Sequence, residues 1–345
     1  MRRLSENMVK VSVIMSAYNC ERYLRETIDS ILNQTFNNFE LIIVNDGSTD
    51  STREILESYA DSRMHIVNQK NMGISKAKNR AAALSSGEYV AVIDADDIWL
   101  PEKLGKQVNF LDEHSDIGLA GTATSVIDKK GRFMGTLRVV ETNEQIQDAL
   151  LKDNCFSHSS IMLRKSIFEK VGYYNEEFDY SLDYDLLLRV SERCRVWNIP
   201  EVLTIWRFNE EGVSVNKHSK QMKYASLARV LAKNRRNARD ENLVANKERI
   251  IGHADRGICK YLSFMQGLLD LWNKSLLLSK AYYGSGCAYL KKGDIDLARQ
   301  FYFTSLRCNF LYIKSYICLF LSILPFRLIR ILYSFKNINA FLIYF

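Results

Sequence analysis

An apolar run that ends abruptly in carboxylates constrains the fold most. Residues Tyr89–Ile93 are apolar and rich in β-branched side chains, which predicts a strand buried on both faces of a parallel sheet. The run stops at Asp94-Ala95-Asp96-Asp97. Carboxylates this close together repel one another and need a cationic partner. The alternative is a polar turn after a strand, because Asp is common in turns.

Two earlier apolar runs follow the same pattern. Val11–Met15 is followed by Ser16-Ala17-Tyr18-Asn19, and Leu41–Val44 by Asn45-Asp46-Gly47. Helical stretches separate these runs, so the chain predicts βαβ units and a mostly parallel sheet flanked by helices. In such sheets the ligand lies beyond the carboxyl ends of the strands. We therefore expect Tyr18, Asp46 and residues 94–97 at one edge.

The chain carries neither of the common glycine-rich phosphate cradles. Ser16-Ala17-Tyr18-Asn19 stands where a dinucleotide fold would have Gly-x-Gly-x-x-Gly or a P-loop would have Gly-Lys-Ser/Thr. A diphosphate would then be held mainly by side chains and a metal. Oxygen ligands favour hard ions, so the aspartates predict Mg²⁺ or Mn²⁺.

Composition separates the chain into two regions. The hydrophobic content of 47% and the charged content of 25% are typical of globular proteins. A chain of 345 residues is long enough for two domains. Seven cysteines without a Cys-x-x-Cys pair indicate reduced thiols in the cytoplasm, and the first residues lack the apolar core of an export signal. From about residue 216 the sequence becomes helical and basic. We expect domains at 1–215 and 216–345.

Four ordered motifs resemble the family 2 glycosyltransferases. They are Val11-Ser-Val-Ile-Met-Ser-Ala-Tyr-Asn19, Val44-Asn-Asp-Gly-Ser-Thr-Asp50, Asn71-x-Gly-x-Ser-x-Ala-x-Asn-Arg80 and Ile93-Asp-Ala-Asp-Asp97. The resemblance runs from about residue 9 to residue 214. It implies an α/β GT-A nucleotide-diphospho-sugar transferase fold, here with an α-helical C-terminal extension, and an inverting reaction. The processive synthases' Gln-x-x-Arg-Trp is absent, which favours transfer of one or a few sugars.

The resemblance also implies roles on the donor side. Asp46 would accept a hydrogen bond from the nucleotide base, Asp96 would bind the metal, and Asp94 would approach the ribose or the metal. Lys76, Lys78 and Arg80 would assist with base or phosphate, or else form a solvated basic face. The donor-binding set is Ala17, Tyr18, Asp46, Lys76, Asp94, Ala95, Asp96 and Arg207.

A second acidic cluster, around residues 179–189, resembles the segment that carries the catalytic base. We expect Asp183 to be that base and prefer it to Asp185, which falls two residues later on the predicted helix. His158 either approaches the substrates or satisfies a local hydrogen bond. Arg207 would pair with phosphate or with a surface carboxylate. Asn209 stands where many relatives have a metal-binding His.

The function expected is transfer of a sugar from a UDP-hexose or UDP-N-acetylhexosamine to a surface polysaccharide or lipid-linked oligosaccharide. The alternatives are a catalytically inactive scaffold or binding subunit and a nucleotidyltransferase. No nucleic-acid motif accompanies the basic C-terminal region, so an anionic membrane surface is the better partner. The charge-free segment 315–326 predicts an interfacial or buried helix, too short to span a bilayer. We expect a cytoplasmic protein, peripheral on the inner membrane face.

Overall fold

The structure is a computed structural model of the 345-residue chain. It describes residues 8–137, 139–178, 180–209, 217–236, 278–287, 289–290, 294–309, 312 and 315–316. The chain divides into two compact units, which are treated separately. The first is Met1–Ser125, Thr136–Arg207 and Lys220–Val244; the second is Val126–Gly135, Phe208–Ser219 and Ala245–Phe345. The domain boundary expected at residue 215 stays a prediction.

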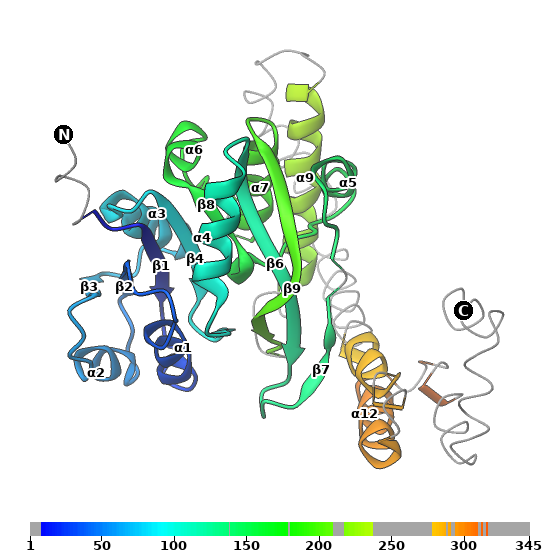
Figure 1. Cartoon of the computed structure of the whole chain (residues 1–345). Helices are drawn as coiled ribbons and strands as arrows, with labels where there is room; N and C mark the ends of the chain where they lie inside the picture. Colours follow the sequence, from blue (N-terminus) through cyan, green and yellow to red (C-terminus); the bar gives the residue numbers. More distant parts are fainter. Residues whose placement is uncertain are drawn as a thin grey trace, which may run out of the picture. The chain divides into compact units, whose positions relative to one another are not determined.

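Four parallel strands form one half of the sheet in the first unit (Figure 1). They lie in the order β3-β2-β1-β4, and Val13 of β1 is opposite both Leu41 of β2 and Ala91 of β4. Helices return the chain between them, as the alternating pattern predicts. The elements are β1 (Val11–Ala17), α1 (Leu24–Leu32), β2 (Phe39–Asp46), α2 (Thr52–Glu57), β3 (Met64–Gln69), α3 (Ile74–Leu84) and β4 (Tyr89–Asp94).

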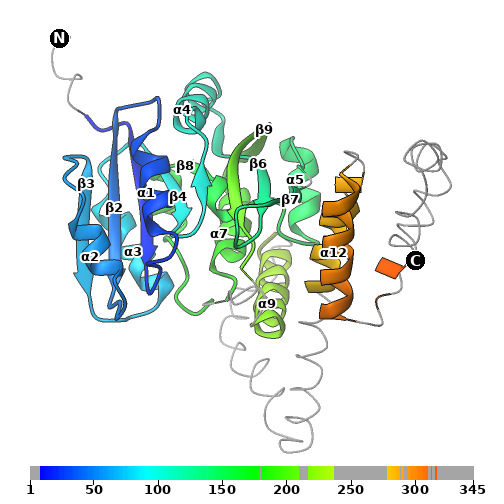
Figure 2. The same cartoon turned by 90° about the horizontal axis from the view of Figure 1, so that it is seen from below.

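The other half of the sheet contains antiparallel pairs. Beyond β4 the order continues β8-β6-β9-β5, with β7 beside β6, and Figure 2 labels all of these strands except β5. Strand β8 runs antiparallel to both β4 and β6. The prediction of a mostly parallel sheet therefore holds for the N-terminal half of the sheet. The predicted α/β fold class is confirmed. The strands are β5 (Ile98–Trp99), β6 (Ile117–Ile127), β7 (Phe133–Thr136), β8 (Met162–Arg164) and β9 (Arg195–Arg207).

Helices cover both faces of this sheet. Because side chains alternate along a strand, Val13 and Met15 pack with α1 on one face, while Ile14 packs with Ala77 of α3 on the other. Both sides of β1, β2 and β4 are thus buried, which explains their continuous apolar runs. The remaining helices of this unit are α4 (Lys103–Glu113), α5 (Asn143–Leu150), α6 (Lys165–Lys170), α7 (Leu182–Ser191) and α9 (His218–Arg236).

Basic residues near the end of α9 hold this helix against α7. Arg235 donates two hydrogen bonds to the Glu192 carboxylate, at 2.7 and 2.8 Å. Arg236 donates to Gln147 Oε1 at 2.7 Å and to Ser191 Oγ at 3.1 Å. Arg235 and Arg236 belong to the basic C-terminal region for which the sequence predicts a membrane partner. Both are used in packing within the first unit.

The described part of the second unit is mainly helical. Residues 278–287 form a helix that packs with α12 (Ile295–Cys308), where Ser305 Oγ donates to the Ser279 carbonyl at 2.8 Å. Close approach is needed here, because a Cβ on Gly286 would lie 2.5 Å from the Tyr302 ring. In the residues that the structure describes, no helix has the length and apolarity that a membrane crossing requires. Most of the segment 315–326 lies outside the described residues.

Candidate active site

The ends of three neighbouring strands bring the donor-side residues together. Ala17 at the end of β1 is opposite Asn45 of β2, and Ser16 is opposite Asp94 of β4. Tyr18, Asp46 and Asp94 therefore follow at the same edge of the sheet. This gathering of residues far apart in sequence confirms the placement expected from the strand pattern.

Asp46 anchors the loop that enters α3. Its buried carboxylate accepts hydrogen bonds from Gln69 Nε2 at 2.7 Å, from the Met72 N–H at 2.8 Å and from the Gly73 N–H at 2.9 Å. Gly73 has a φ of +95°, a conformation that glycine adopts readily. The sequence reasoning missed this structural role, for which the Asn71-x-Gly73 turn was the available signal. The base-binding role of Asp46 stays a prediction.

The other expected donor residues differ in exposure. Ala17 is buried, whereas Tyr18 is 51% exposed. Asn19 turns the chain after it with a φ of +47°, and its Oδ1 accepts from the Thr49 N–H at 2.8 Å. Lys76 is exposed on α3. The two exposed side chains are available to a ligand, and the site role of each stays a prediction.

Asp94 is already paired with a buried cation. Lys78 is fully buried on α3, and its Nζ lies 2.8 Å from Asp94 Oδ1. The other oxygen, Oδ2, lies 3.3 Å from Nδ1 of His158, which is in the 3₁₀ helix η1 (His158–Ser160). Burial alone would raise the pKa of Asp94, but Lys78 and His158 hold that pKa well below its usual value. Lys78 is thus not part of a solvated face.

Asp97 and Asp96 meet different surroundings. Asp97 is buried and accepts hydrogen bonds from the Arg207 N–H at 2.9 Å and from Ser159 Oγ. Burial and the charges of Asp96 and Asp94 raise the pKa of Asp97 well above its usual value. Asp96 is half-buried, and burial together with the charge of Asp94 raises its pKa to about 6. The buried Asp97 therefore stabilises the loop, while Asp96 is the more exposed of these two carboxylates and the one that a cation could reach.

Arg207 ties β9 to this carboxylate loop. Its guanidinium is buried, donates from Nε to the Asp96 carbonyl at 3.0 Å and pairs with Glu26 Oε2 at 2.5 Å. The same group lies 4.2 Å from the centre of the Tyr23 ring. The sequence predicts either a phosphate or a surface carboxylate as the partner of Arg207, and the exposed Glu26 is such a carboxylate. The structure adds that the guanidinium is buried and also bonds to the Asp96 carbonyl. Its role toward phosphate stays a prediction.

The two aspartates in the first turn of α7 are held differently. Asp185 is buried and forms an ion pair with Arg189, whose Nε donates to Asp185 Oδ2 at 2.8 Å. Arg189 also donates to the Tyr173 carbonyl at 2.8 Å. Asp183 is half-buried and accepts from Asn154 Nδ2 at 3.0 Å. Asp185 is thus committed to packing, and Asp183 is the carboxylate left to meet a substrate.

Tyr174 is linked to the donor-side carboxylates through His158. Its hydroxyl lies 2.9 Å from Nε2 of His158, whose other ring nitrogen faces Asp94. Burial, and then the charges of Asp94 and Asp183, raise the pKa of Tyr174 well above its usual value. His158 is therefore locally bonded, and it also bridges the donor edge to Tyr174. Sequence reasoning missed both Tyr174 and Asn154, because no spacing marks them.

The comparisons with known proteins agree with this geometry. Residues 12–172 match the family model described as Glycosyl transferase family 2. The uncharacterized glycosyltransferase MJ1057 of Methanocaldococcus jannaschii is 32% identical over 222 residues, which are 62% of this chain and 76% of that protein. The O-antigen biosynthesis glycosyltransferase WbnJ of Escherichia coli is 34% identical over 207 residues, 58% of this chain and 80% of WbnJ.

This chain belongs to glycosyltransferase family 2. It is accordingly an enzyme of the transferase class. Its fold is also that of S. aureus TarS 1-349, with a TM-score of 0.52 and 20% identity over 85% of this chain and 90% of TarS. TarS has been crystallised in complex with UDP and with UDP-GlcNAc. The GT-A fold expected for the glycosyltransferase is confirmed.

The residues of this glycosyltransferase fit a cation shared with a ligand better than a protein-only metal site. Within the described ranges, no group of three or more His, Cys, Asp or Glu side chains is arranged to hold a metal. Both oxygens of Asp94 already face Lys78 and His158. Asp96 remains as one carboxylate with a raised pKa. Mg²⁺ commonly uses only one or two protein carboxylates together with substrate phosphates, so this donor set fits.

Proposed function

We propose that this glycosyltransferase moves one sugar from a UDP-hexose or UDP-N-acetylhexosamine to an acceptor hydroxyl with inversion. The observation that carries the proposal is that each acidic cluster leaves one half-buried carboxylate, Asp96 on the donor side and Asp183 on the acceptor side. Their neighbours Asp94 and Asp185 are already paired with Lys78 and Arg189. A single displacement needs a leaving group at one cluster and a base at the other.

Asp183 is the proposed catalytic base. It would take the proton of the acceptor hydroxyl as that oxygen attacks the anomeric carbon, and the bond to the donor diphosphate breaks. Asn154 holds one carboxylate oxygen at 3.0 Å and orients the group. The buried pairing of Asp185 with Arg189 supports Asp183 over Asp185 for this role.

The donor site is proposed at the edge formed by β1, β2 and β4. The exposed Tyr18 is available to the base, while Asp46, whose carboxylate already accepts three hydrogen bonds, lies at the end of β2. A divalent cation bound at Asp96, Mn²⁺ or Mg²⁺, would neutralise charge on the departing diphosphate. The UDP and UDP-GlcNAc complexes of TarS support a uridine nucleotide.

The proposed acceptor is a surface polysaccharide or a lipid-linked oligosaccharide, reached at the inner face of the cell membrane. WbnJ is named for O-antigen biosynthesis, which supports a polysaccharide role. The exposed Lys233 of α9 would still be available to an anionic surface, whereas Arg235 and Arg236 are not. Association with the membrane is tested by flotation of the full chain with phosphatidylglycerol vesicles.

A panel of nucleotide sugars tests the proposal. Thermal shift and Mn²⁺-dependent hydrolysis are measured for UDP-, GDP- and dTDP-sugars, and we expect a response to UDP-sugars. Asp96→Asn should abolish the metal dependence, because it removes the charge that the cation needs. Asp148→Asn, an exposed aspartate on α5, is the matched control and should behave like wild type. Binding without hydrolysis or transfer by the wild type would instead favour the inactive binding subunit.

A further inference from the structure

Arg207 holds the loop that carries the donor-side carboxylates. Its backbone N–H donates to Asp97 Oδ1 at 2.9 Å, and its Nε donates to the Asp96 carbonyl at 3.0 Å. The Arg207 side chain is 3% exposed. A guanidinium is charged at any ordinary pH, and a buried one needs a counter-ion. A positive charge is therefore bonded to the backbone of the residue that we expect to hold the donor cation.

Glu26 is the counter-ion of this guanidinium. It lies on α1, 181 positions from Arg207, and its Oε2 accepts from Arg207 Nη2 at 2.5 Å. Tyr23, the residue before α1, has its ring centre 4.2 Å from the same guanidinium. The Glu26 side chain is 55% exposed. Ion pairs with an exposed partner contribute little to folding, so we look to the site for the role of this pair.

The ion pair with Glu26 leaves the Asp96 carboxylate free. Within the part of the chain that the structure describes, Arg207 forms an ion pair with Glu26 and none with Asp96. Nε of the guanidinium meets the carbonyl of Asp96 instead of its carboxylate. Charge-assisted hydrogen bonds between Arg and a carboxylate are among the strong ones. If Glu26 were absent, Asp96 would be a carboxylate of the residue that Arg207 already contacts.

We propose that Glu26 is a positioning residue for the donor cation. It holds the charge of Arg207 away from the Asp96 carboxylate, which stays available to Mn²⁺ or Mg²⁺. Without Glu26, the guanidinium would pair with Asp96, and a cation would have to displace it. This inference rests on the proposed function, which it deepens by naming a residue that sets the affinity for the cation.

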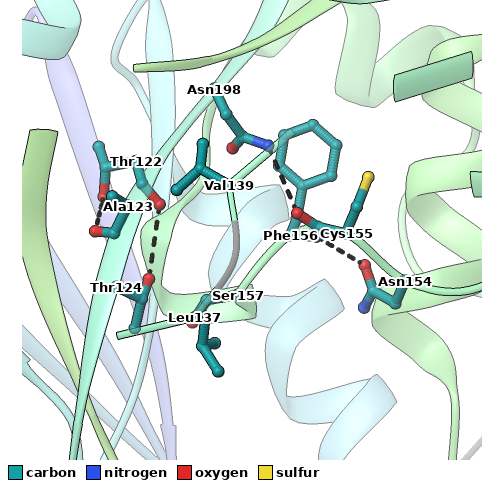
Figure 3. Close-up of a pocket in the computed structure, with 10 residues that line it drawn as sticks. All are labelled: Thr122, Ala123, Thr124, Leu137, Val139, Asn154, Cys155, Phe156, Ser157 and Asn198. Carbon is teal, nitrogen blue, oxygen red and sulfur yellow. Dashed lines mark hydrogen bonds between the residues drawn. The ribbon is translucent and has the colours of Figure 1, made fainter. Parts of the chain in front are cut away.

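The contacts of Glu26 are separate from the acceptor side. The pocket drawn in Figure 3 has Asn154 among its described lining residues, and Asn154 Nδ2 donates to Asp183 at 3.0 Å. Neither Glu26 nor Arg207 is among the described residues that line this pocket. A variant at Glu26 therefore alters the cation side without replacing a described group next to the candidate base.

Uptake of Mn²⁺ by the full chain tests the inference. Free Mn²⁺ is measured by electron paramagnetic resonance in the presence of UDP, with UDP alone as the blank. Glu26→Ala should weaken Mn²⁺ binding by about tenfold, the effect of one hydrogen bond to a charged group. Glu26→Gln keeps an acceptor for Arg207 without the charge and should lie between Glu26→Ala and wild type. Glu57→Ala is the matched control and should bind Mn²⁺ as wild type does, since Glu57 is also a helical glutamate, 52% exposed and paired with Arg53.

A double-mutant cycle shows whether Glu26 acts through Arg207. In Arg207→Met, the change Glu26→Ala should have no further effect on Mn²⁺ binding, because no guanidinium is left to restrain. A tenfold loss in that background as well would show that Glu26 attracts the cation directly, and would overturn the positioning role. The thermal shift with UDP in the absence of metal should stay at the wild-type value in Glu26→Ala. A loss of that shift would show a general disturbance of the donor edge and would also overturn the role.

The remaining outcomes separate this inference from the proposed function. Wild-type Mn²⁺ affinity in Glu26→Ala, with none in Asp96→Asn, would overturn the role of Glu26 alone, whether or not Arg207→Met folds. A wild type that takes up no Mn²⁺ in the presence of UDP would overturn the proposed cation site and this inference with it.

Discussion

The two halves of the sheet position their functional residues in different ways. On the parallel half, Asp46 is held by residues 69–73, no more than 27 positions away. On the antiparallel half the contacts join distant segments: Asn79 binds the backbone of Tyr174 across 95 positions, and Arg207 reaches Glu26 across 181. Asp46 is therefore positioned by segments close to it in the sequence, whereas Tyr174 and Arg207 are positioned only by the complete tertiary structure.

The largest expected effect separates catalysis from donor binding. Asp183→Asn should lower the rate of sugar transfer by about 10²–10⁴-fold, the usual contribution of a general base. The UDP thermal shift should stay at the wild-type value, because Asp183 belongs to the antiparallel half. Asp148→Asn is the control. Transfer at the wild-type rate would remove Asp183 from the role.

The second prediction compares two carboxylates on one helix. Asp185→Ala should cost about 3–5 kcal/mol in the free energy of unfolding, because it leaves the largely buried Arg189 without its partner. Asp183→Ala should cost about 1 kcal/mol, the value of its hydrogen bond from Asn154. Urea denaturation of both variants measures the difference. Equal losses would show that the two positions are not distinct in structural role.

A third change acts on the parallel half. Gly47 has a φ of +74°, and a Cβ there would lie 2.6 Å from the Asn71 backbone nitrogen. Gly47→Ala should therefore cost about 2–3 kcal/mol, through backbone strain and displacement of the loop that Asp46 holds. Gly131→Ala is the control, since Gly131 has a φ of +78° with nothing within 4 Å of a Cβ. It should lose only about 1 kcal/mol, and it should bind UDP as wild type does. A loss as small in Gly47→Ala would contradict the close contact.

The smallest effect is a pH dependence far from both acidic clusters. Burial alone would raise the pKa of Glu40, but hydrogen bonds from Ser12 and Ser86 outweigh it and lower that pKa. Since the folded-state pKa is lowered, this stabilisation is present above the unfolded value of about 4.3 and is lost as pH falls below it. Glu40→Gln should remove about 1 kcal/mol at neutral pH and flatten the stability curve below pH about 4.3. An unchanged acid limb would show that Glu40 does not contribute.

Sequence reasoning predicted the parallel half well, because its signals are local. Continuous apolar runs mark strands buried on both faces, and the residue after each run lies at the edge where a ligand binds. The same reasoning could not find Tyr174 or Asn154, whose partners lie in distant segments. It also placed Lys78 on a solvated face or at the ligand, whereas burial makes Lys78 the partner of Asp94. Of the two partners expected for Arg207, the structure shows the surface carboxylate, Glu26.

The amino-acid sequence by itself determined the family, the alternation of strands and helices, and the end of each strand where polar residues gather. Hydrophobic periodicity and turn residues act over a few positions, so they can be read without a structure. Only the tertiary structure decided which carboxylates are neutralised within the protein and which remain for a ligand. That outcome depends on burial and on charged or polar partners brought together by folding, as Asp185 with Arg189 and Asp183 with Asn154 show.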